Sequence, residues 1–103
     1  MEIFSGKSVV EVEIKALNLL KKSIDYNFKK AVNLLFGVKG KIIISGIGKS
    51  GHIGSKISST LSSIGSPSFF IHPSEANHGD LGMVTKKDCA ILISNSGETS
   101  ELF

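Results

Sequence analysis

A glycine-rich segment near the middle of the chain has the residue types and spacing of a phosphate-binding loop. It reads SGIGKSGHIGSK over residues 45–56, and its Gly-x-Gly-x-x-Gly pattern runs from Gly46 to Gly51 around Lys49 and Ser50. Glycines allow a sharp turn after a strand and a close approach of the backbone to a ligand, and the N–H groups that open the next helix attract an anion. Dinucleotide, nucleoside-triphosphate and sugar-phosphate sites all use such a segment.

The neighbouring residues separate these alternatives only in part. A nucleoside-triphosphate loop needs a glycine five residues before Gly48, and that position is Ile43, so this alternative is excluded. A dinucleotide fold needs an acidic residue at the end of the second strand, where this chain has His72, with Glu75 in the following loop. The dinucleotide site is therefore weakened but stays open, as does a glycine-rich turn that binds nothing.

A second segment, SNSGETSE at residues 94–101, also follows an apolar run and opens a predicted helix. Ser94, Ser96 and Thr99 can donate hydrogen bonds to phosphate oxygens, and the intervening glycine lets the backbone close in. The alternative is an ordinary helix N-terminus in which Ser96 acts as the cap. Two such segments at strand ends favour a binding site, because ligands of open α/β sheets bind at the carboxyl ends of the strands.

Several titratable residues lie in or near these segments and could perform proton transfer. A lysine and a carboxylate that converge on a sugar phosphate could serve ring opening and proton transfer, and a histidine could serve either. Two histidines without a third ligand, His72 and His78, are a weak metal signal, so no metal is expected. The candidates are Lys49, His52, His72, Glu75, His78, Asp80, Glu98 and Glu101.

The pattern of apolar residues predicts the elements that position these segments. Two amphipathic helices are expected first, over residues 8–24 and 26–37, the first capped by Ser8 with Glu11 as its capping-box partner. A continuous β-branched run at 41–46 predicts a strand buried on both faces.

The rest of the chain continues the alternation of strands and helices. The expected elements are a helix over 50–64, a strand over 67–72, a loop over 73–83, a strand over 88–94 and the start of a helix at 95. Ile53, Ile57, Leu61 and Ile64 form the stripe by which the first of these helices is expected to pack. The order predicts an α/β fold with a parallel sheet, incomplete at three strands and preceded by helices.

Composition narrows the kinds of partner. All 12 basic residues are lysines, and the net charge of +3 is scattered, which argues against nucleic acid because its readers rely on arginine. The single cysteine, Cys89, is expected in the core, and one cysteine cannot form a disulfide within the chain. Neither a signal peptide nor an apolar run of membrane-spanning length is evident, so a cytoplasmic protein without membrane partners is expected.

These motifs together resemble a known family. The sequence GKSGHIG followed by HPSEANHGDLGMV and SNSGETSE is similar to the N-terminal sugar-isomerase (SIS) domain of bacterial arabinose-5-phosphate isomerases, from about Gly40 onward. The resemblance implies a parallel-sheet αβα sandwich with flavodoxin-like strand order. It also implies domain bounds of 1–39 for the helical segment and 40–103 for part of the SIS domain.

The resemblance further implies an activity. The family interconverts D-ribulose 5-phosphate and D-arabinose 5-phosphate through an enediol, without an organic cofactor, on the route to the lipopolysaccharide sugar Kdo. Family members are tetramers, so a homo-oligomer is expected. They continue with further SIS strands, a further glutamate and histidine, and a pair of CBS domains, none of which occurs in these 103 residues. Catalysis by this chain alone is therefore not expected, and a non-catalytic sugar-phosphate-binding module or regulator is the alternative.

Residue roles follow from the same resemblance. Lys49 matches a lysine that polarises the sugar oxygens or assists ring opening, Glu101 matches a catalytic glutamate, and His78 lies in the substrate pocket. The residues expected to bind substrate are Gly48 and Ser50 near the sugar, and Ser94, Asn95, Ser96 and Thr99 around the phosphate.

Overall fold

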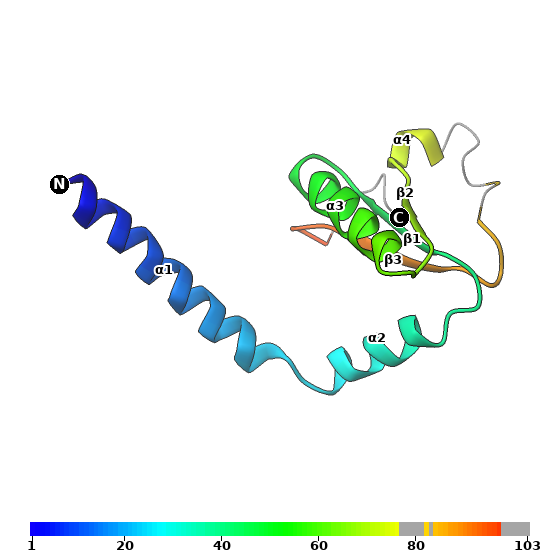
Figure 1. The fold of residues 1–103 in the computed structure, drawn as a ribbon, viewed down its shortest axis with the longest axis horizontal. Coiled ribbons are helices and arrows are strands. Elements are labelled where there is room, and N and C mark those ends of the chain that lie inside the picture. The colour runs from blue at the N-terminus through cyan, green and yellow to red at the C-terminus, as the bar shows by residue number, and fades with distance from the viewer. Residues whose placement is uncertain (77–81, 83, 98–103) are drawn as a thin grey trace. The chain divides into compact units, whose positions relative to one another are not determined.

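A computed structural model describes residues 1–76, 82 and 84–97 of the chain (Figure 1). The chain divides into two compact units, Met1–Leu34 and Leu35–Phe103. No helix among the described residues is long and apolar enough to cross a membrane.

The first unit is helical. Helix α1 spans Glu2–Ser23 and α2 spans Tyr26–Phe36, with an extended break at Ile24 between them. The predicted start at Ser8 is wrong, since the helix begins six residues earlier. The segment on the N-terminal side of this serine is helical although it contains Gly6, a poor helix former, so a serine-glutamate pair that could form a capping box stands inside the helix instead. Asp25 caps the start of α2, where its Oδ1 accepts the backbone N–H of Asn27 at 2.9 Å.

The second unit contains a parallel sheet, as the alternation of elements predicted. Its strands are β1 (Ile42–Gly46), β2 (Ser68–Phe70) and β3 (Cys89–Ile93), in the order β2-β1-β3. Both pairings are parallel, which confirms the α/β class and the flavodoxin-like order of these three strands. The central strand β1 is buried along its whole length, as its β-branched run predicted.

The outer strand β3 is less buried than its apolar sequence suggested. Its residues alternate between half-buried and exposed, and Leu92 is 45% exposed. Cys89 is half-buried rather than in the core. A strand with one hydrogen-bonded neighbour lets alternate side chains face solvent, which an apolar sequence alone cannot reveal.

Helix α3 (Lys49–Ser63) packs against the sheet through a face that was not predicted (Figure 1). Its buried residues are Gly51, Gly54 and Ser58, whereas Ile53 is 57% exposed. A Cβ atom added at Gly54 would lie 2.9 Å from Ile44 Cγ2, so the helix approaches β1 too closely for larger side chains. The expected packing stripe is therefore wrong for its three isoleucines, which are exposed, whereas its Leu61 is half-buried.

Serine hydroxyls join α3 to the sheet through two serines of this helix, Ser58 and Ser62. Ser62 Oγ donates to the Ser68 carbonyl at 2.8 Å, and Ser68 Oγ donates to the Ile42 carbonyl at 2.6 Å and lies 3.2 Å from Ser58 Oγ. Ser45, which is buried in β1, donates to the Ile71 carbonyl at 2.6 Å. The bonds of Ser45, Ser58 and Ser68 satisfy polar groups that burial would otherwise leave without partners, whereas that of Ser62 is exposed.

A buried carboxylate fastens the beginnings of β1 and β3 together. Asp88 Oδ1 accepts the backbone N–H of Lys41 at 2.7 Å, and Oδ2 accepts that of Thr85 at 2.8 Å. Lys41 Nζ lies 3.5 Å from Oδ2, and the Asp88 side chain is only 1% exposed. The N–H of Lys41, followed by that of Thr85, holds the pKa of Asp88 below its usual value, against the opposing effect of burial.

Asp88→Asn is expected to destabilise the second unit at neutral pH, with an effect that shrinks in acid. Because the pKa is lower in the folded state, the carboxylate contributes stability above its unfolded pKa of about 3.9 and loses it as pH falls through the folded value. An asparagine can accept one of the two N–H groups but presents its own NH₂ to the other. Urea midpoints of both proteins at pH 7 and in steps below pH 4 measure the difference. A difference between the two urea midpoints that stays constant across this pH range would contradict the role assigned to the Asp88 carboxylate.

Candidate functional site

The register of the sheet brings the two predicted segments together at one edge. Gly46, the last residue of β1, pairs with Ile93, the last residue of β3. Because the strands are parallel, the chain leaves both of them on the same side. The residues that follow β1 therefore lie beside those that follow β3.

A cavity of about 250 Å³ occupies this junction and is called the hydroxyl pocket below. Its lining residues are Ile47, Ser50, Ile93, Ser94, Asn95 and Ser96. Four of them are residues that the sequence assigned to substrate binding. The junction of neighbouring strands from which the chain proceeds in different directions is the usual ligand position in such sheets.

The segment after β3 has the local structure of a capped turn. Ser94 Oγ accepts the backbone N–H of Gly97 at 3.0 Å, and Gly97 has a φ of 74°. The Ser94 hydroxyl thus caps this turn. The helix that Ser96 would cap in the alternative interpretation lies outside the residues that the structure describes, so that alternative stays a prediction. The turn holds Asn95 and Ser96 at the wall of the pocket.

The start of α3 supplies unsatisfied backbone donors near the same pocket. Its N-cap is Gly48, which makes no side-chain cap, and its first turn holds no acidic residue. The first N–H groups of the helix and its dipole consequently favour a negatively charged ligand. Ser50, in the first turn, lines the hydroxyl pocket directly.

Lys49 is the first residue of α3 and is exposed. It lines neither the hydroxyl pocket nor the second cavity described next, although both of its neighbours line one of them. Its four-carbon side chain places a cation at the helix start without filling either space. The position suits a residue that reaches a ligand from solvent.

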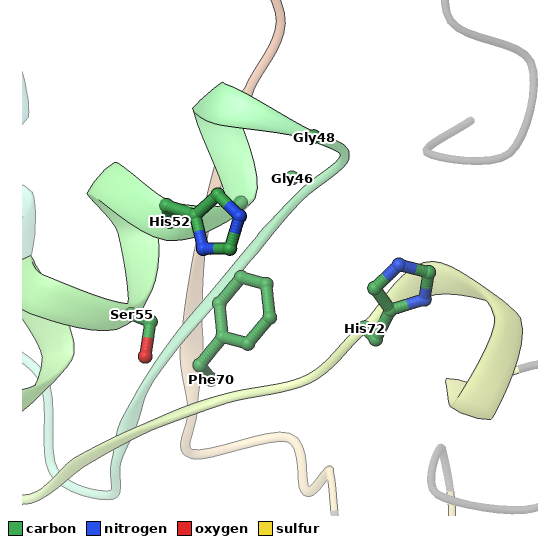
Figure 2. Close-up of a pocket in the computed structure, with 7 residues that line it drawn as sticks. Gly46, Gly48, His52, Ser55, Phe70 and His72 are labelled. Carbon is green, nitrogen blue, oxygen red and sulfur yellow. The ribbon is translucent and has the colours of Figure 1, made fainter.

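A second cavity, of about 360 Å³, lies on the other side of the β1–α3 turn and is called the imidazole cavity below (Figure 2). Figure 2 shows the rings of His52 and Phe70 on one side of it and that of His72 across from them. The lining residues are Gly46, Gly48, Gly51, His52, Ser55, Phe70 and His72. Gly48, which was expected near the sugar, lines this cavity and not the hydroxyl pocket.

The sequence listed both histidines as candidates but did not pair them. The available signal was positional, since His72 lies two residues after the end of β2 and His52 lies in the first turn of α3. Both positions lie at the carboxyl edge of the sheet, where ligands bind. The close approach of α3 to β1 and β2, which brings the two rings to one cavity, could not be predicted from the pattern of apolar residues.

Five of the candidate residues lie outside the part of the chain that the structure describes: His78, Asp80, Glu98, Thr99 and Glu101. Their roles remain predictions. Among the described residues, no group of three or more histidine, cysteine or acidic side chains could hold a metal ion.

The fold and the strand-end loops define a member of the SIS domain family. The family model for the SIS domain matches residues 34–103, so the chain belongs to this family. Among individual proteins, the chain is 54% identical over 98 residues to the arabinose 5-phosphate isomerase KdsD of Shigella flexneri. The match covers 95% of this chain and 30% of the relative, so the chain spans less than a third of that protein's length.

Solved structures give the same grouping. A protein of Escherichia coli CFT073 in complex with arabinose 5-phosphate is similar with a TM-score of 0.88 and 46% identity, over 97% of this chain and 53% of that one. A Bacteroides fragilis protein assigned to the phosphosugar isomerases and to capsule formation has a TM-score of 0.89 and 42% identity, over 98% of this chain and 54% of that one.

Proposed function

We propose that this chain forms part of an arabinose-5-phosphate isomerase, which interconverts D-ribulose 5-phosphate and D-arabinose 5-phosphate. The observation that carries the proposal is the hydroxyl pocket. Serine hydroxyls, an asparagine and the uncapped start of α3 meet there at the edge of the sheet. Hydrogen-bond donors beside a helix start whose first turn holds no acidic residue suit a phosphate monoester. The names of the similar proteins point to the same substrate class.

The proposed reaction moves one proton between two carbons. A base removes the proton from the carbon beside the carbonyl, an enediol forms, and the proton returns to the neighbouring carbon, while the hydroxyl proton moves to the other oxygen. No redox partner is needed, and we propose that no organic cofactor takes part. Glu101 is proposed as the residue that transfers the proton, His78 as part of the pocket, and Lys49 as the cation that polarises the sugar oxygens or assists ring opening.

The setting of the reaction is also part of the proposal. We place the enzyme in the cytoplasm, in the formation of the lipopolysaccharide sugar Kdo, as a homo-oligomer. Exposed apolar side chains in α3 and at its C-cap support an assembly or a larger protein around this unit, since Ile53 is 57% and Ile64 71% exposed. Nucleic acid and membrane are not proposed as partners.

Ser96→Ala is expected to weaken the binding of D-arabinose 5-phosphate by about tenfold or more, because a hydrogen bond to a charged group is stronger than a neutral one. Calorimetric titration of the 103-residue chain measures this effect. Inorganic phosphate should lose affinity in parallel, since the lost donor faces the phosphate. Lys56→Ala, at an exposed residue of α3 that lines neither cavity, is the control. If Ser96→Ala binds D-arabinose 5-phosphate with unchanged affinity, the phosphate does not bind in the hydroxyl pocket.

A further inference from the structure

The hydrogen bonds of His72 determine which of its ring nitrogens carries the proton. Its Nδ1 accepts the backbone N–H of Ser74 at 3.2 Å and lies 2.8 Å from Ser74 Oγ. A backbone N–H can only donate, so Nδ1 has no proton in this arrangement. The neutral imidazole consequently carries its proton on Nε2. The hydrogen bond from the Ser74 N–H, at the start of α4 (Pro73–Ala76), therefore makes Nε2 a donor.

The donor lies at the imidazole cavity. Figure 2 shows the second ring nitrogen of His72 on the side of the ring away from α4, and His72 lines the cavity together with His52 and Ser55. The ring of Phe70 adds an apolar face, and three glycines leave backbone within reach of a ligand. An aromatic face with a few well-placed hydrogen-bonding groups suits a ligand that has both C–H and O–H surface, as a sugar chain does.

The two cavities share one turn. Ile47 and Ser50 line the hydroxyl pocket, whereas Gly46, Gly48 and Gly51 line the imidazole cavity. A ligand with its phosphate in the hydroxyl pocket could therefore extend past Gly48, which is exposed, to the other side of the turn. A ligand in that position would also pass the start of α3, where Lys49 stands.

We propose that the imidazole cavity holds the hydroxylated carbon chain of the sugar phosphate whose phosphate occupies the hydroxyl pocket, and that His72 donates its Nε2–H to a sugar oxygen. The inference rests on the proposed function and adds His72 to the residues that bind the substrate. His72 then distinguishes a sugar phosphate from phosphate alone. It has no role in holding the phosphate group.

Two substitutions separate the two nitrogens of His72. In His72→Asn the amide oxygen can replace Nδ1 as acceptor for the Ser74 N–H, but nothing replaces Nε2. In His72→Gln the longer amide can place a donor near the position of Nε2, but the acceptor at Nδ1 is lost. If His72 binds the sugar, His72→Asn should weaken sugar-phosphate binding more than His72→Gln does. If His72 has a purely structural role, His72→Gln should weaken it more.

Calorimetric titrations of the 103-residue chain with D-arabinose 5-phosphate and with inorganic phosphate test the proposal. His72→Asn is expected to weaken the sugar phosphate about 2- to 10-fold, the value of one neutral hydrogen bond, and to leave inorganic phosphate unchanged. His72→Gln is expected to keep more of the sugar-phosphate affinity. Lys56→Ala should match the parent with both ligands.

The other outcomes overturn the proposal in distinguishable ways. If His72→Asn binds the sugar phosphate as the parent does while Ser96→Ala binds it weakly, the inference is wrong and the phosphate site stands. If His72→Gln loses more affinity than His72→Asn, or if both ligands weaken together, His72 acts only through the structure of α4. If the parent does not bind D-arabinose 5-phosphate, the proposed function fails, and the inference fails with it.

A measurement on the parent chain covers the case in which a variant does not fold. D-arabinose 5-phosphate should shift the NMR resonances of the imidazole rings of both His52 and His72, and inorganic phosphate should leave them in place. Equal shifts with the two ligands, or no shift with either, contradict the proposal. The ¹⁵N shifts should also show a protonated Nε2 and an unprotonated Nδ1 on His72.

Discussion

Lys49→Ala is expected to lower isomerase turnover about 100-fold or more in a chimera in which this chain replaces its aligned segment of the Shigella flexneri relative. The physical reason is that the ammonium group at the start of α3 would stabilise negative charge that develops on the sugar oxygens as the enediol forms. Steady-state conversion of D-arabinose 5-phosphate to D-ribulose 5-phosphate measures the effect. Lys49 is exposed, so its loss should leave the urea midpoint unchanged.

Two further variants define the role of the lysine. Lys49→Arg keeps the positive charge but cannot give up a proton near neutral pH, so it should retain activity if the charge alone matters and lose it if proton transfer matters. Lys56→Ala serves as the control for losing a lysine from the same helix. Turnover of Lys49→Ala within about threefold of the chimera would contradict the assigned role. A chimera that binds the sugar phosphate without converting it would favour the non-catalytic binding module.

Gly54→Val is expected to lower the free energy of unfolding of the second unit by about 1–3 kcal/mol, toward the upper end of that range. An added Cβ at Gly54 would already lie 2.9 Å from Ile44 Cγ2 and 3.3 Å from Phe70 Cε2, before the two methyl groups of valine are placed. Ile44 is fully buried in the central strand and cannot move aside. The helix would have to lift from the sheet.

Urea unfolding of this variant and of Lys56→Val, a valine on the exposed side of the same helix, separates crowding from helix propensity. The control should change stability by no more than about 0.5–1 kcal/mol. Ile44→Ala combined with Gly54→Val should cost less than the sum of the two single substitutions, because alanine lacks the Cγ2 atom that an added Cβ at position 54 would meet. Additive costs would show that the close approach of α3 to β1 is not the reason why valine at position 54 is destabilising.

The elements that could be predicted are those whose pattern permits one interpretation. The run of isoleucines from Ile42 to Ile44 fits only a strand buried on both faces, and the glycine that ends it fixes where the chain turns. The alternation with α3 and β2 then leaves few topologies for a parallel sheet. The α/β class and the strand order follow from these local features.

The packing face of α3 could not be predicted, because two sets of residues in that helix share helical spacing. One set is apolar and includes Ile53, and the other is small and includes Gly51 and Gly54. Hydrophobicity favours the first set, but the tight turn after β1 brings the helix backbone so close to the sheet that only the second set fits. An added Cβ at Gly51 would lie 2.7 Å from the Gly46 carbonyl oxygen.

One part of the candidate site could likewise be predicted from the sequence, and the other part could not. The hydroxyl pocket could be anticipated, because Ser50 and the segment from Ser94 to Ser96 each follow a strand, and parallel strands end at one edge. The imidazole cavity could not be anticipated, because it depends on how closely α3 approaches β2. His52 and His72 become partners through that packing, although 20 positions separate them in the sequence.

The backbone conformation of the turn between the two cavities restricts the chirality of the residue at position 48. Gly48 has φ 63° and ψ −130°, and no atom outside its own neighbourhood lies within 4 Å of where a Cβ would stand. Space is therefore not what requires glycine there. The mirror image of this conformation lies in the polyproline II region, which L-residues adopt readily, so position 48 has the backbone of a D-residue. Asparagine, which tolerates the left-handed helical region, gains nothing at this ψ. The turn between the two cavities thus depends on the one achiral amino acid, and an alanine of D configuration would fit where every L side chain is strained.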